Sequence, residues 1–268
     1  MRFFLKAFEF YIHSSIHVAF AVVSLAIFRI HAMHLPTDYS FLALIFFATI
    51  SGYNFVKYAG IAKLYHRRLT RQLKVIQIFS GISFIAMSYF IFQLKLESIF
   101  ILLVLSIMNF FYAFPIFTNG KNLRNLSGLK IFVIAFVWST TCVILPTVEY
   151  ASVVSVEVVF HFVQNLLMIV ALMVPFEIRD YRFDDKSLQT LPQLFGVFKT
   201  KILGMLLLLL VLILGFATNS INIYYTLIFV SCLIPLILFA KINQPKYYAS
   251  FWVEALPIIA LLIYLTKI

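Results

Sequence analysis

The sequence predicts an all-α protein, a polytopic bundle that crosses a membrane with about nine helices of about 20 residues each. Of its 268 residues, 63% are hydrophobic and only 12% are charged, whereas soluble domains carry about 25% charged residues. The apolar residues also gather into segments of the length that spans a bilayer as a helix. Basic residues between these segments alternate between many and few. We therefore expect one integral membrane domain over residues 1–268, with a cytoplasmic N-terminus.

The apolar segments follow one another with polar connections of unequal length. In chain order, they are 10–30, 40–58, 73–92, 99–117, 129–146, 153–175, 202–217, 221–240 and 249–266. An alternative start for the seventh lies near Leu194. Pro235 and Pro257 fall inside the last two segments and predict kinks there. The two long inner connections follow the second and sixth segments, so we expect polar helical extensions at these places.

The orientation follows from the basic residues. With the N-terminus inside, 18 of the 21 Lys and Arg residues lie on the inner side, and only Arg29, Lys95 and Lys267 lie outside. Positively charged loops remain cytoplasmic, so topology explains the net charge of +11 and nucleic acid is not an expected partner. We expect a bacterial cytoplasmic (inner) membrane, with membrane lipid around the helices and the long loops in the cytoplasm. The sequence contains no Walker, Rossmann or Ser-His-Asp pattern.

Acidic residues are concentrated directly after the sixth segment, where four of the ten carboxylates lie between positions 177 and 185. On a helix, Glu177, Asp180 and Asp184 occupy positions i, i+3 and i+7 of one stripe. Like charges on one stripe repel each other, and a divalent cation relieves the repulsion. Oxygen ligands suit Mg²⁺, which bridges carboxylates to substrate phosphates. The alternative is a solvated loop that is neutralised by its own basic residues, Arg179, Arg182 and Lys186.

Two inner loops resemble those of the UbiA-type membrane prenyltransferases. Asp180 and Asp184, followed by Thr190-Leu191-Pro192 and Gly196, resemble the second Asp-rich motif of this family. After the fourth segment, Tyr112-Ala113-Phe114-Pro115 resembles the family's Tyr-Ser-x-Pro stretch. The basic residues and glycine that follow this stretch are Lys121, Arg124 and Gly128-Leu129-Lys130.

The first Asp-rich motif of that family departs from its pattern in this chain. Asn54 aligns with the motif's Asn, but Phe55, Tyr58 and Ala62 stand where the family has aspartates. Asn54, Lys57 and Tyr58 share one helical face. Two hypotheses remain open. Either the Lys57 ammonium replaces one Mg²⁺ as a counter-charge to a diphosphate, or Lys57 pairs with Asp180 or Asp184 and closes the site.

The resemblance implies a UbiA-like bundle that moves a prenyl group from a prenyl diphosphate to a lipophilic acceptor. Asp180 and Asp184 would be the catalytic residues, and Glu177 would join them in holding Mg²⁺. The diphosphate-binding residues would be Asn54, Lys57, Tyr112, Lys121 and Arg124. A quinone precursor, a haem-like ring and another lipid are alternatives for the acceptor. The degenerate first motif leaves a second hypothesis open: an inactive UbiA-like scaffold or lipid-binding protein.

Two further pairs of residues are separated by one helical turn. His13 and His17 have a spacing that suits a metal, but with no third ligand nearby we favour a packing role. Glu157 and His161 lie within the sixth segment, where ionisable groups are often functional. We interpret them as a pair near the outer interface.

Overall fold

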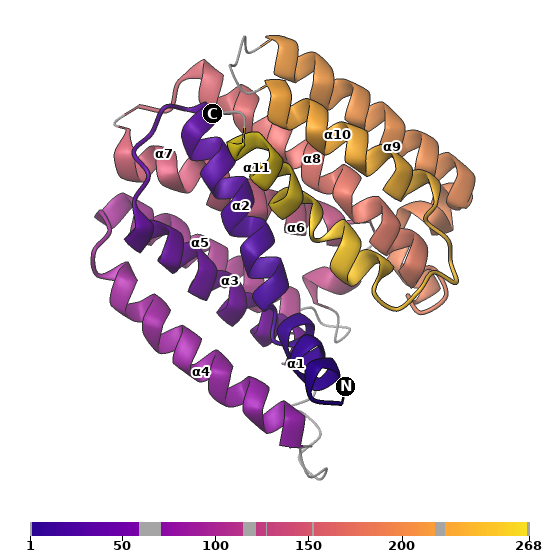
Figure 1. Cartoon of the computed structure of the whole chain (residues 1–268), viewed down its shortest axis with the longest axis horizontal. Coiled ribbons are helices and arrows are strands. Elements are labelled where there is room, and N and C mark those ends of the chain that lie inside the picture. Colours follow the sequence, from indigo (N-terminus) through magenta and orange to yellow (C-terminus); the bar gives the residue numbers. More distant parts are fainter. Residues whose placement is uncertain are drawn as a thin grey trace. The chain divides into compact units, whose positions relative to one another are not determined.

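The computed structural model describes residues 2–58, 71–114, 122–126, 128–151, 153–217 and 223–266. In these ranges, all regular secondary structure is helical (Figure 1), as predicted. The chain divides into two compact units. Unit one comprises Met1–Val23 and Asp38–Arg124, and unit two comprises Ser24–Thr37 and Asn125–Ile268. The expectation of one integral membrane domain stays a prediction.

Every predicted apolar segment lies on helical structure within the described residues. In the part of the chain that the structure describes, seven helices are long and apolar enough to cross a membrane, and the bent pair at the N-terminus, taken as one span, raises this number to eight. The helix Ile223–Leu238 is apolar but has only 16 residues. The structure thus confirms a polytopic helical membrane protein, while the count of nine and the side of the N-terminus stay predictions.

Unit one consists mainly of α-helices from the N-terminal half of the chain. They are α1 (Arg2–His13), the first part of α2 (Ile16–Ala32), α3 (Tyr39–Tyr58), α4 (Arg71–Ile91) and α5 (Leu96–Ala113), followed by the short 3₁₀ helix η2 (Leu123–Asn125). α3 packs against α4 and α5, and α1 packs against α4. The first predicted span is not one straight helix, because α1 and α2 meet at an angle of 56°.

Unit two contains the end of α2 and the remaining helices. They are α6 (Lys130–Ser139), the π-helix η3 (Thr140–Ile144), α7 (Leu145–Tyr150), α8 (Val156–Asp180), η4 (Lys186–Leu188), α9 (Leu191–Ala217), α10 (Ile223–Leu238), the π-helix η5 (Tyr248–Val253) and α11 (Leu256–Leu265). α9 begins before the predicted 202, even earlier than the alternative start at Leu194. Gly196 interrupts α9 with a left-handed φ of 78°.

α8 lies at the centre of unit two, where it packs against α6, α9, α10 and both π-helices. Of its most apolar 18-residue window, 61% is buried, compared with 28% for α9. The contact with α9 is close because α9 has glycines at the crossing. A Cβ at Gly204 would lie 3.4 Å from Val174 of α8. α8 continues past Pro175 to Asp180, which confirms the expected polar extension of the sixth segment.

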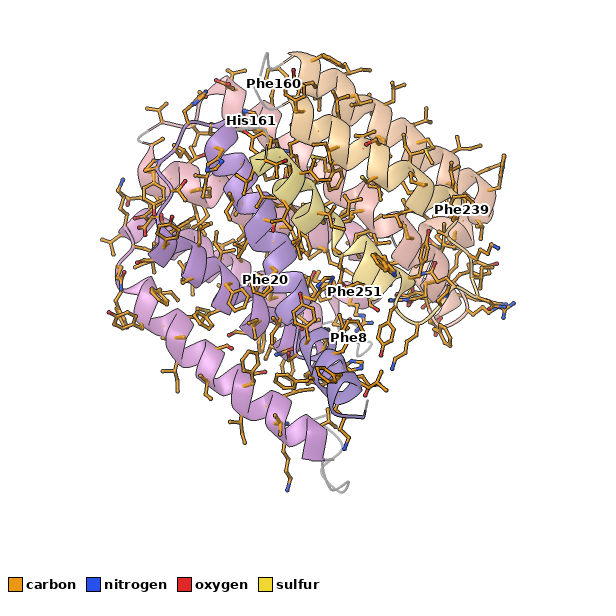
Figure 2. All side chains as sticks on the ribbon, in the orientation of Figure 1. Phe8, Phe20, Phe160, His161, Phe239 and Phe251 are labelled. Atoms are coloured by element: carbon orange, nitrogen blue, oxygen red, sulfur yellow. The ribbon has the colours of Figure 1, made fainter. Side chains whose placement is uncertain are left out.

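Large apolar side chains cover the outer helices, as expected for contact with lipid. In α4, only 11% of the apolar window is buried, and in α5 only 17%. Phe160 of α8 and Phe239 directly after α10 are exposed to 44% and 69% (Figure 2). An apolar surface of this extent is not compatible with water, so the structure supports an integral membrane protein.

Candidate functional site

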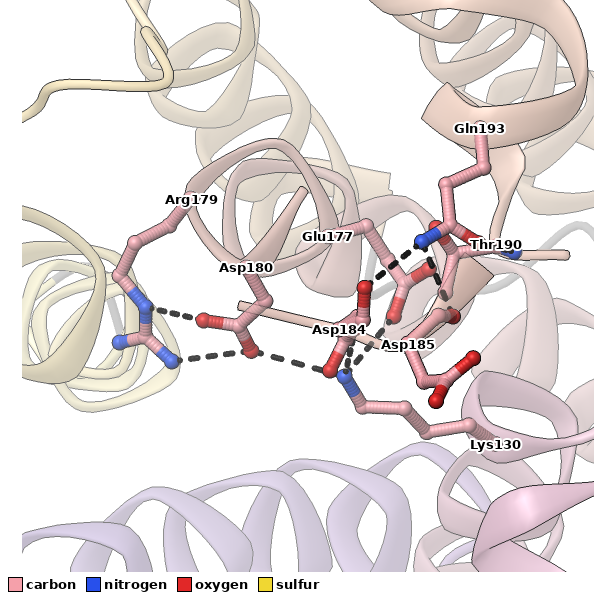
Figure 3. A network of polar contacts seen from close by, with 8 residues as sticks. All are labelled: Lys130, Glu177, Arg179, Asp180, Asp184, Asp185, Thr190 and Gln193. Atoms are coloured by element: carbon pink, nitrogen blue, oxygen red, sulfur yellow. Dashed lines mark hydrogen bonds and ion pairs between the residues drawn. The ribbon is translucent and has the colours of Figure 1, made fainter. Parts of the chain in front are cut away.

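Three of the four carboxylates of the acidic stretch converge on one ammonium group in unit two (Figure 3). Lys130 Nζ donates a hydrogen bond to Asp184 Oδ2 at 2.9 Å. It also lies 3.5 Å from Asp180 Oδ2 and 3.4 Å from Glu177 Oε1. These side chains, Lys130, Glu177, Asp180 and Asp184, form what we call the Lys130 cluster. Their side chains are between 2% and 23% exposed, so the charges are largely shielded from bulk solvent.

The Lys130 cluster is built from two helix ends with opposite dipoles. Lys130 is the first residue of α6, and Asp180 is the last residue of α8. A helix N-terminus carries a partial positive charge and a C-terminus a partial negative one. The Lys130 ammonium interacts unfavourably with the N-terminal dipole of its own helix, and the Asp180 carboxylate with the C-terminal dipole of its own. Each side chain is therefore stabilised when it reaches toward the end of the other helix. The ammonium therefore offsets the carboxylates and also the C-terminal dipole of α8.

The predicted helical stripe is wrong for one of its three members. α8 ends at Asp180, and the chain then turns with Asp184 N–H donating to the Asp180 carbonyl at 2.9 Å. Asp184 is therefore not the i+7 residue of a helix. Its carboxylate joins the other two because the turn brings it back toward Lys130. Arg179 adds a second cation through a bidentate contact with Asp180, at 2.7 and 3.2 Å.

Backbone contacts fix the two loops that carry the cluster. Gly128, two residues before Lys130, donates its N–H to the Leu188 carbonyl at 2.9 Å. Gly128 has φ +69°, a conformation that favours glycine. Gln193 Nε2 donates to the Asp184 carbonyl at 3.1 Å and to the Asp185 carbonyl at 3.2 Å. These contacts set the position of the ammonium relative to the carboxylates.

A small recess lies beside Lys130, with room for about one water molecule. Its lining includes Lys130, Glu177 and Thr190, with apolar side chains for the rest. Thr190 Oγ1 is buried without a hydrogen-bond partner, and Glu177 Oε1 has only its ion pair with Lys130 at 3.4 Å. Buried polar atoms in proteins are nearly always paired, so the recess suits a small polar ligand or a water molecule.

The predicted metal ligands do come together, but not around a metal-sized space. Carboxylate oxygens are the ligands that Mg²⁺ prefers, at 2.0–2.1 Å in octahedral geometry. The position shared by the three carboxylates is taken by Lys130 Nζ. In the described part of the chain, no group of three or more His, Cys, Asp or Glu side chains has the geometry to hold a metal ion. As built, the Lys130 cluster does not fit Mg²⁺.

In unit one, the residues at the expected first motif hold the break between α1 and α2. Asn54 Oδ1 accepts from Ser15 Oγ at 2.8 Å, and Asn54 Nδ2 donates to the Ser14 carbonyl at 3.0 Å. Lys57 Nζ donates to Ser15 Oγ at 2.8 Å. Ser15 has a left-handed φ of 65°, so these contacts stabilise a strained turn. Tyr58 Oη also donates to the His13 carbonyl, at 3.0 Å.

The remaining predicted diphosphate-binding residues lie near the end of unit one. Tyr112 of α5 is buried, with 6% of its surface exposed. Arg124 lies in η2 and is exposed. Lys121 lies outside the described residues. Their roles in binding a diphosphate stay predictions, as do the two hypotheses for Lys57.

Arg29, which the sequence analysis counted with the residues of the outer side, is fully buried within α2. This burial was not predicted. Arg29 Nη1 donates to Gln164 Oε1 at 2.7 Å, and Arg29 Nε donates to Asn165 Oδ1 at 3.0 Å. The guanidinium also contacts His161 Nδ1 at 3.4 Å and Met168 Sδ at 3.1 Å. We call these five residues the Arg29 cluster.

The smaller predictions fare differently. His17 is buried and its Nδ1 lies 2.8 Å from the Tyr11 hydroxyl, which supports a packing role. The predicted contact between Glu157 and His161 exists, at 3.8 Å. Glu157 is on the surface, but His161 is buried and belongs to the Arg29 cluster. The sequence signal for that cluster was a short run of polar residues, Gln164 and Asn165, inside an apolar segment.

Comparison with solved structures gives matches over almost the whole chain. The apo structure of a UbiA homologue from Aeropyrum pernix K1 has a TM-score of 0.64 and 13% sequence identity, covering 94% of this chain and 98% of the other. A UbiA homologue from Archaeoglobus fulgidus, bound to GPP and Mg²⁺, has a TM-score of 0.62 and 11% identity, covering 96% and 98%. The chain therefore has a UbiA-type fold.

A third match is a structure of digeranylgeranylglyceryl phosphate synthase, with a TM-score of 0.58, 15% identity and coverage of 98% of this chain and 99% of the other. Each of these matches extends over almost the whole of the given chain. No protein-family profile and no curated protein sequence matches the chain. The solved structures therefore establish the fold of this chain, and its chemistry depends on its own residues.

Proposed function

We propose that this protein binds a prenyl diphosphate in the membrane and transfers the prenyl group to a lipophilic acceptor. The observation that carries the proposal is the likeness over almost the full chain to a UbiA homologue solved with GPP and Mg²⁺. The homologue from Archaeoglobus fulgidus was also solved with DMAPP and Mg²⁺. The shielded group of charges at the end of α8 supplies a polar site at which a charged ligand could bind.

In the proposed reaction, the bond between C1 of the prenyl group and the diphosphate oxygen breaks, and the electron pair leaves with the diphosphate. The allylic cation then bonds to a nucleophilic atom of the acceptor, which releases a proton. Lys57, Lys121 and Arg124 would bind the diphosphate, with Asn54 and Tyr112 beside them. Positive charge that is fixed before the reaction stabilises the departing anion and is the main catalytic term.

No step of the proposed prenyl transfer is assigned to Mg²⁺. Asp180 and Asp184, the proposed catalytic pair, carry suitable ligand atoms together with Glu177. In this structure, however, Lys130 fills the space between them. The proposal locates the protein in a bacterial cytoplasmic membrane with this site on the cytoplasmic side, because the loops that carry it are rich in basic residues. A quinone precursor, a haem-like ring or another lipid would serve as the acceptor.

A second candidate function is a UbiA-like scaffold that binds lipid without turnover. Two observations favour it. Lys130 neutralises the carboxylates that would hold a metal, and Asn54 and Lys57 are used to hold the break between α1 and α2. In this case, the fold would be retained for its membrane surface rather than for catalysis.

One experiment separates the two functions. The purified protein is titrated with radiolabelled geranyl or farnesyl diphosphate, in Mg²⁺ and in EDTA, and released diphosphate is measured in the presence of bacterial lipid extract. We expect saturable binding that Lys57→Ala weakens at least about tenfold, a difference of about 1.4 kcal/mol. Lys199→Ala, which removes an exposed lysine of α9, is the control. No binding at millimolar concentration would reject the prenyltransferase and favour the scaffold.

A further inference from the structure

The Lys130 cluster brings three negatively charged groups close together in a largely buried place. Three carboxylates belonging to a single short stretch of chain point at one position, and like charges this close repel strongly when water is scarce. The cluster therefore requires a cation at its centre. In the structure, that cation is an ammonium group from α6 and not a metal ion.

The position of the ammonium is set by the fold and not by a free side chain. Lys130 is only 9% exposed and stands at the start of α6. The preceding Gly128 is tied to Leu188, which belongs to the same loop as Asp184 and Thr190. The backbone therefore carries Lys130 and its acidic partners as one assembly.

The space around the ammonium leaves no room for a metal ion. The contacts of 2.9, 3.4 and 3.5 Å between Lys130 Nζ and the carboxylates leave no central position for Mg²⁺. The adjoining recess holds about one water, whereas Mg²⁺ usually keeps several waters in its shell. With Lys130 and Arg179 counted, the three carboxylates retain a single net negative charge, which attracts a divalent cation weakly.

The recess shows that the site has polar capacity beyond its ion pairs. Glu177 and Thr190 both line it; Thr190 Oγ1 is buried without a hydrogen bond, and Glu177 Oε1 has only its ion pair with Lys130. The residues are 2% and 3% exposed, so bulk water does not satisfy them. Without the lysine, these oxygens and the other carboxylates would face a single vacated position.

We propose that the Lys130 ammonium takes the place of a divalent cation in this cluster, and that its removal opens a metal site formed by Glu177, Asp180 and Asp184. The inference concerns metal binding by the resting protein and does not rest on prenyl transfer. It distinguishes this chain, with an ammonium among its carboxylates, from the UbiA homologue that was solved with Mg²⁺. The protein holds its carboxylates together without a metal.

The test is a titration of the purified full-length protein with Mn²⁺ alone, followed by electron paramagnetic resonance of the free ion. We expect no saturable binding by the wild type below millimolar Mn²⁺. Lys130→Met should bind Mn²⁺ at least about tenfold more tightly than the wild type does, and Lys130→Met/Asp184→Asn should lose this binding. Lys130→Arg keeps the positive charge and should behave as the wild type. Size-exclusion chromatography confirms that each variant is folded.

Two results would overturn the proposal. One is saturable Mn²⁺ binding by the wild type that Asp184→Asn abolishes, and this result needs no variant of Lys130. The other is a folded Lys130→Met protein that gains no site. Neither result depends on whether geranyl diphosphate binds, so failure of this inference and failure of the proposed function are distinguishable.

Discussion

Among its described residues, unit two buries two basic side chains, Arg29 and Lys130, and it stabilises them in different ways. Lys130 at the start of α6 meets three carboxylates. Arg29 within α2 has no carboxylate partner among the described residues, and its hydrogen bonds go to amides, an imidazole and a thioether. The two cations also differ in exposure, because the Lys130 side chain is 11% exposed, whereas Arg29 is fully buried.

The difference teaches where a membrane bundle places its anions. A carboxylate inside a span, at the position of Gln164 or Asn165 in α8, must lose its hydration, and the attraction to its partner often fails to offset this cost. Neutral amides lose less when they are buried and still accept hydrogen bonds from a guanidinium. At a helix end, by contrast, carboxylates remain partly hydrated and also interact with the helix dipoles. Arg29 is therefore surrounded by neutral hydrogen-bond acceptors, whereas Lys130 is surrounded by carboxylates.

The largest effect is expected for Lys130→Met, which leaves three carboxylates without their ammonium. Breaking a buried ion pair by removing one partner costs about 3–5 kcal/mol, and we expect a loss of this size in the free energy of unfolding without metal. Millimolar Mg²⁺ should restore part of it. Denaturant unfolding in detergent measures both values, with Lys130→Arg as the control. A Lys130→Met protein as stable as the wild type in EDTA would remove the distinction between the two clusters.

A smaller effect is expected for Asn165→Leu in the Arg29 cluster. This change removes the acceptor of Arg29 Nε, and an unsatisfied buried donor costs about 1–3 kcal/mol. Asn165→Asp keeps an acceptor and adds a counter-charge, so it should lose less stability than Asn165→Leu. The same unfolding measurement compares them, and Mg²⁺ should rescue neither. If Asn165→Leu unfolds like the wild type, the amides do not stabilise Arg29.

Gly215→Ala tests the Arg29 cluster from the side of α9. A Cβ at Gly215 would lie 3.0 Å from Gln164 Nε2, which donates to the Val211 carbonyl at 3.0 Å. Moving this amide disturbs an acceptor of Arg29, and we expect a loss of about 1 kcal/mol, the lower end for overpacking. Gly81→Ala is the matched control, because a Cβ there meets nothing within 4 Å. Equal stability of the two variants would contradict the close packing at Gly215.

The smallest effect is expected for Glu157→Gln. The Glu157 side chain is 63% exposed, and it lies 3.8 Å from His161 Nε2, too far for a hydrogen bond. Exposed ion pairs contribute little, so we expect a change below about 0.5 kcal/mol in the free energy of unfolding. A change larger than that from Asn165→Leu would show that Glu157 supplies the missing counter-charge to the Arg29 cluster.

The sequence predicted the acidic part of the Lys130 cluster because charge is rare in this chain. It did not predict the partner. Lys130 entered only as one of the inner basic residues that resemble those of the UbiA family, and not as a partner of the carboxylates. The helical phase of Asp184 was wrong because α8 ends at Asp180, and a periodicity argument does not detect that end. The burial of Arg29 was not predicted, because Arg29 stands near the end of an apolar segment.

The sequence by itself determined the all-helical membrane class, the approximate positions of the spans and the stretch in which charges gather. These properties depend on hydropathy and charge over short distances along the chain. Only the tertiary structure decided which cation meets which anion or dipole. Lys130 and Asp184 are 54 positions apart, and Arg29 and Asn165 are 136 apart. Such pairs meet through helix packing and loop contacts, which local sequence patterns do not encode.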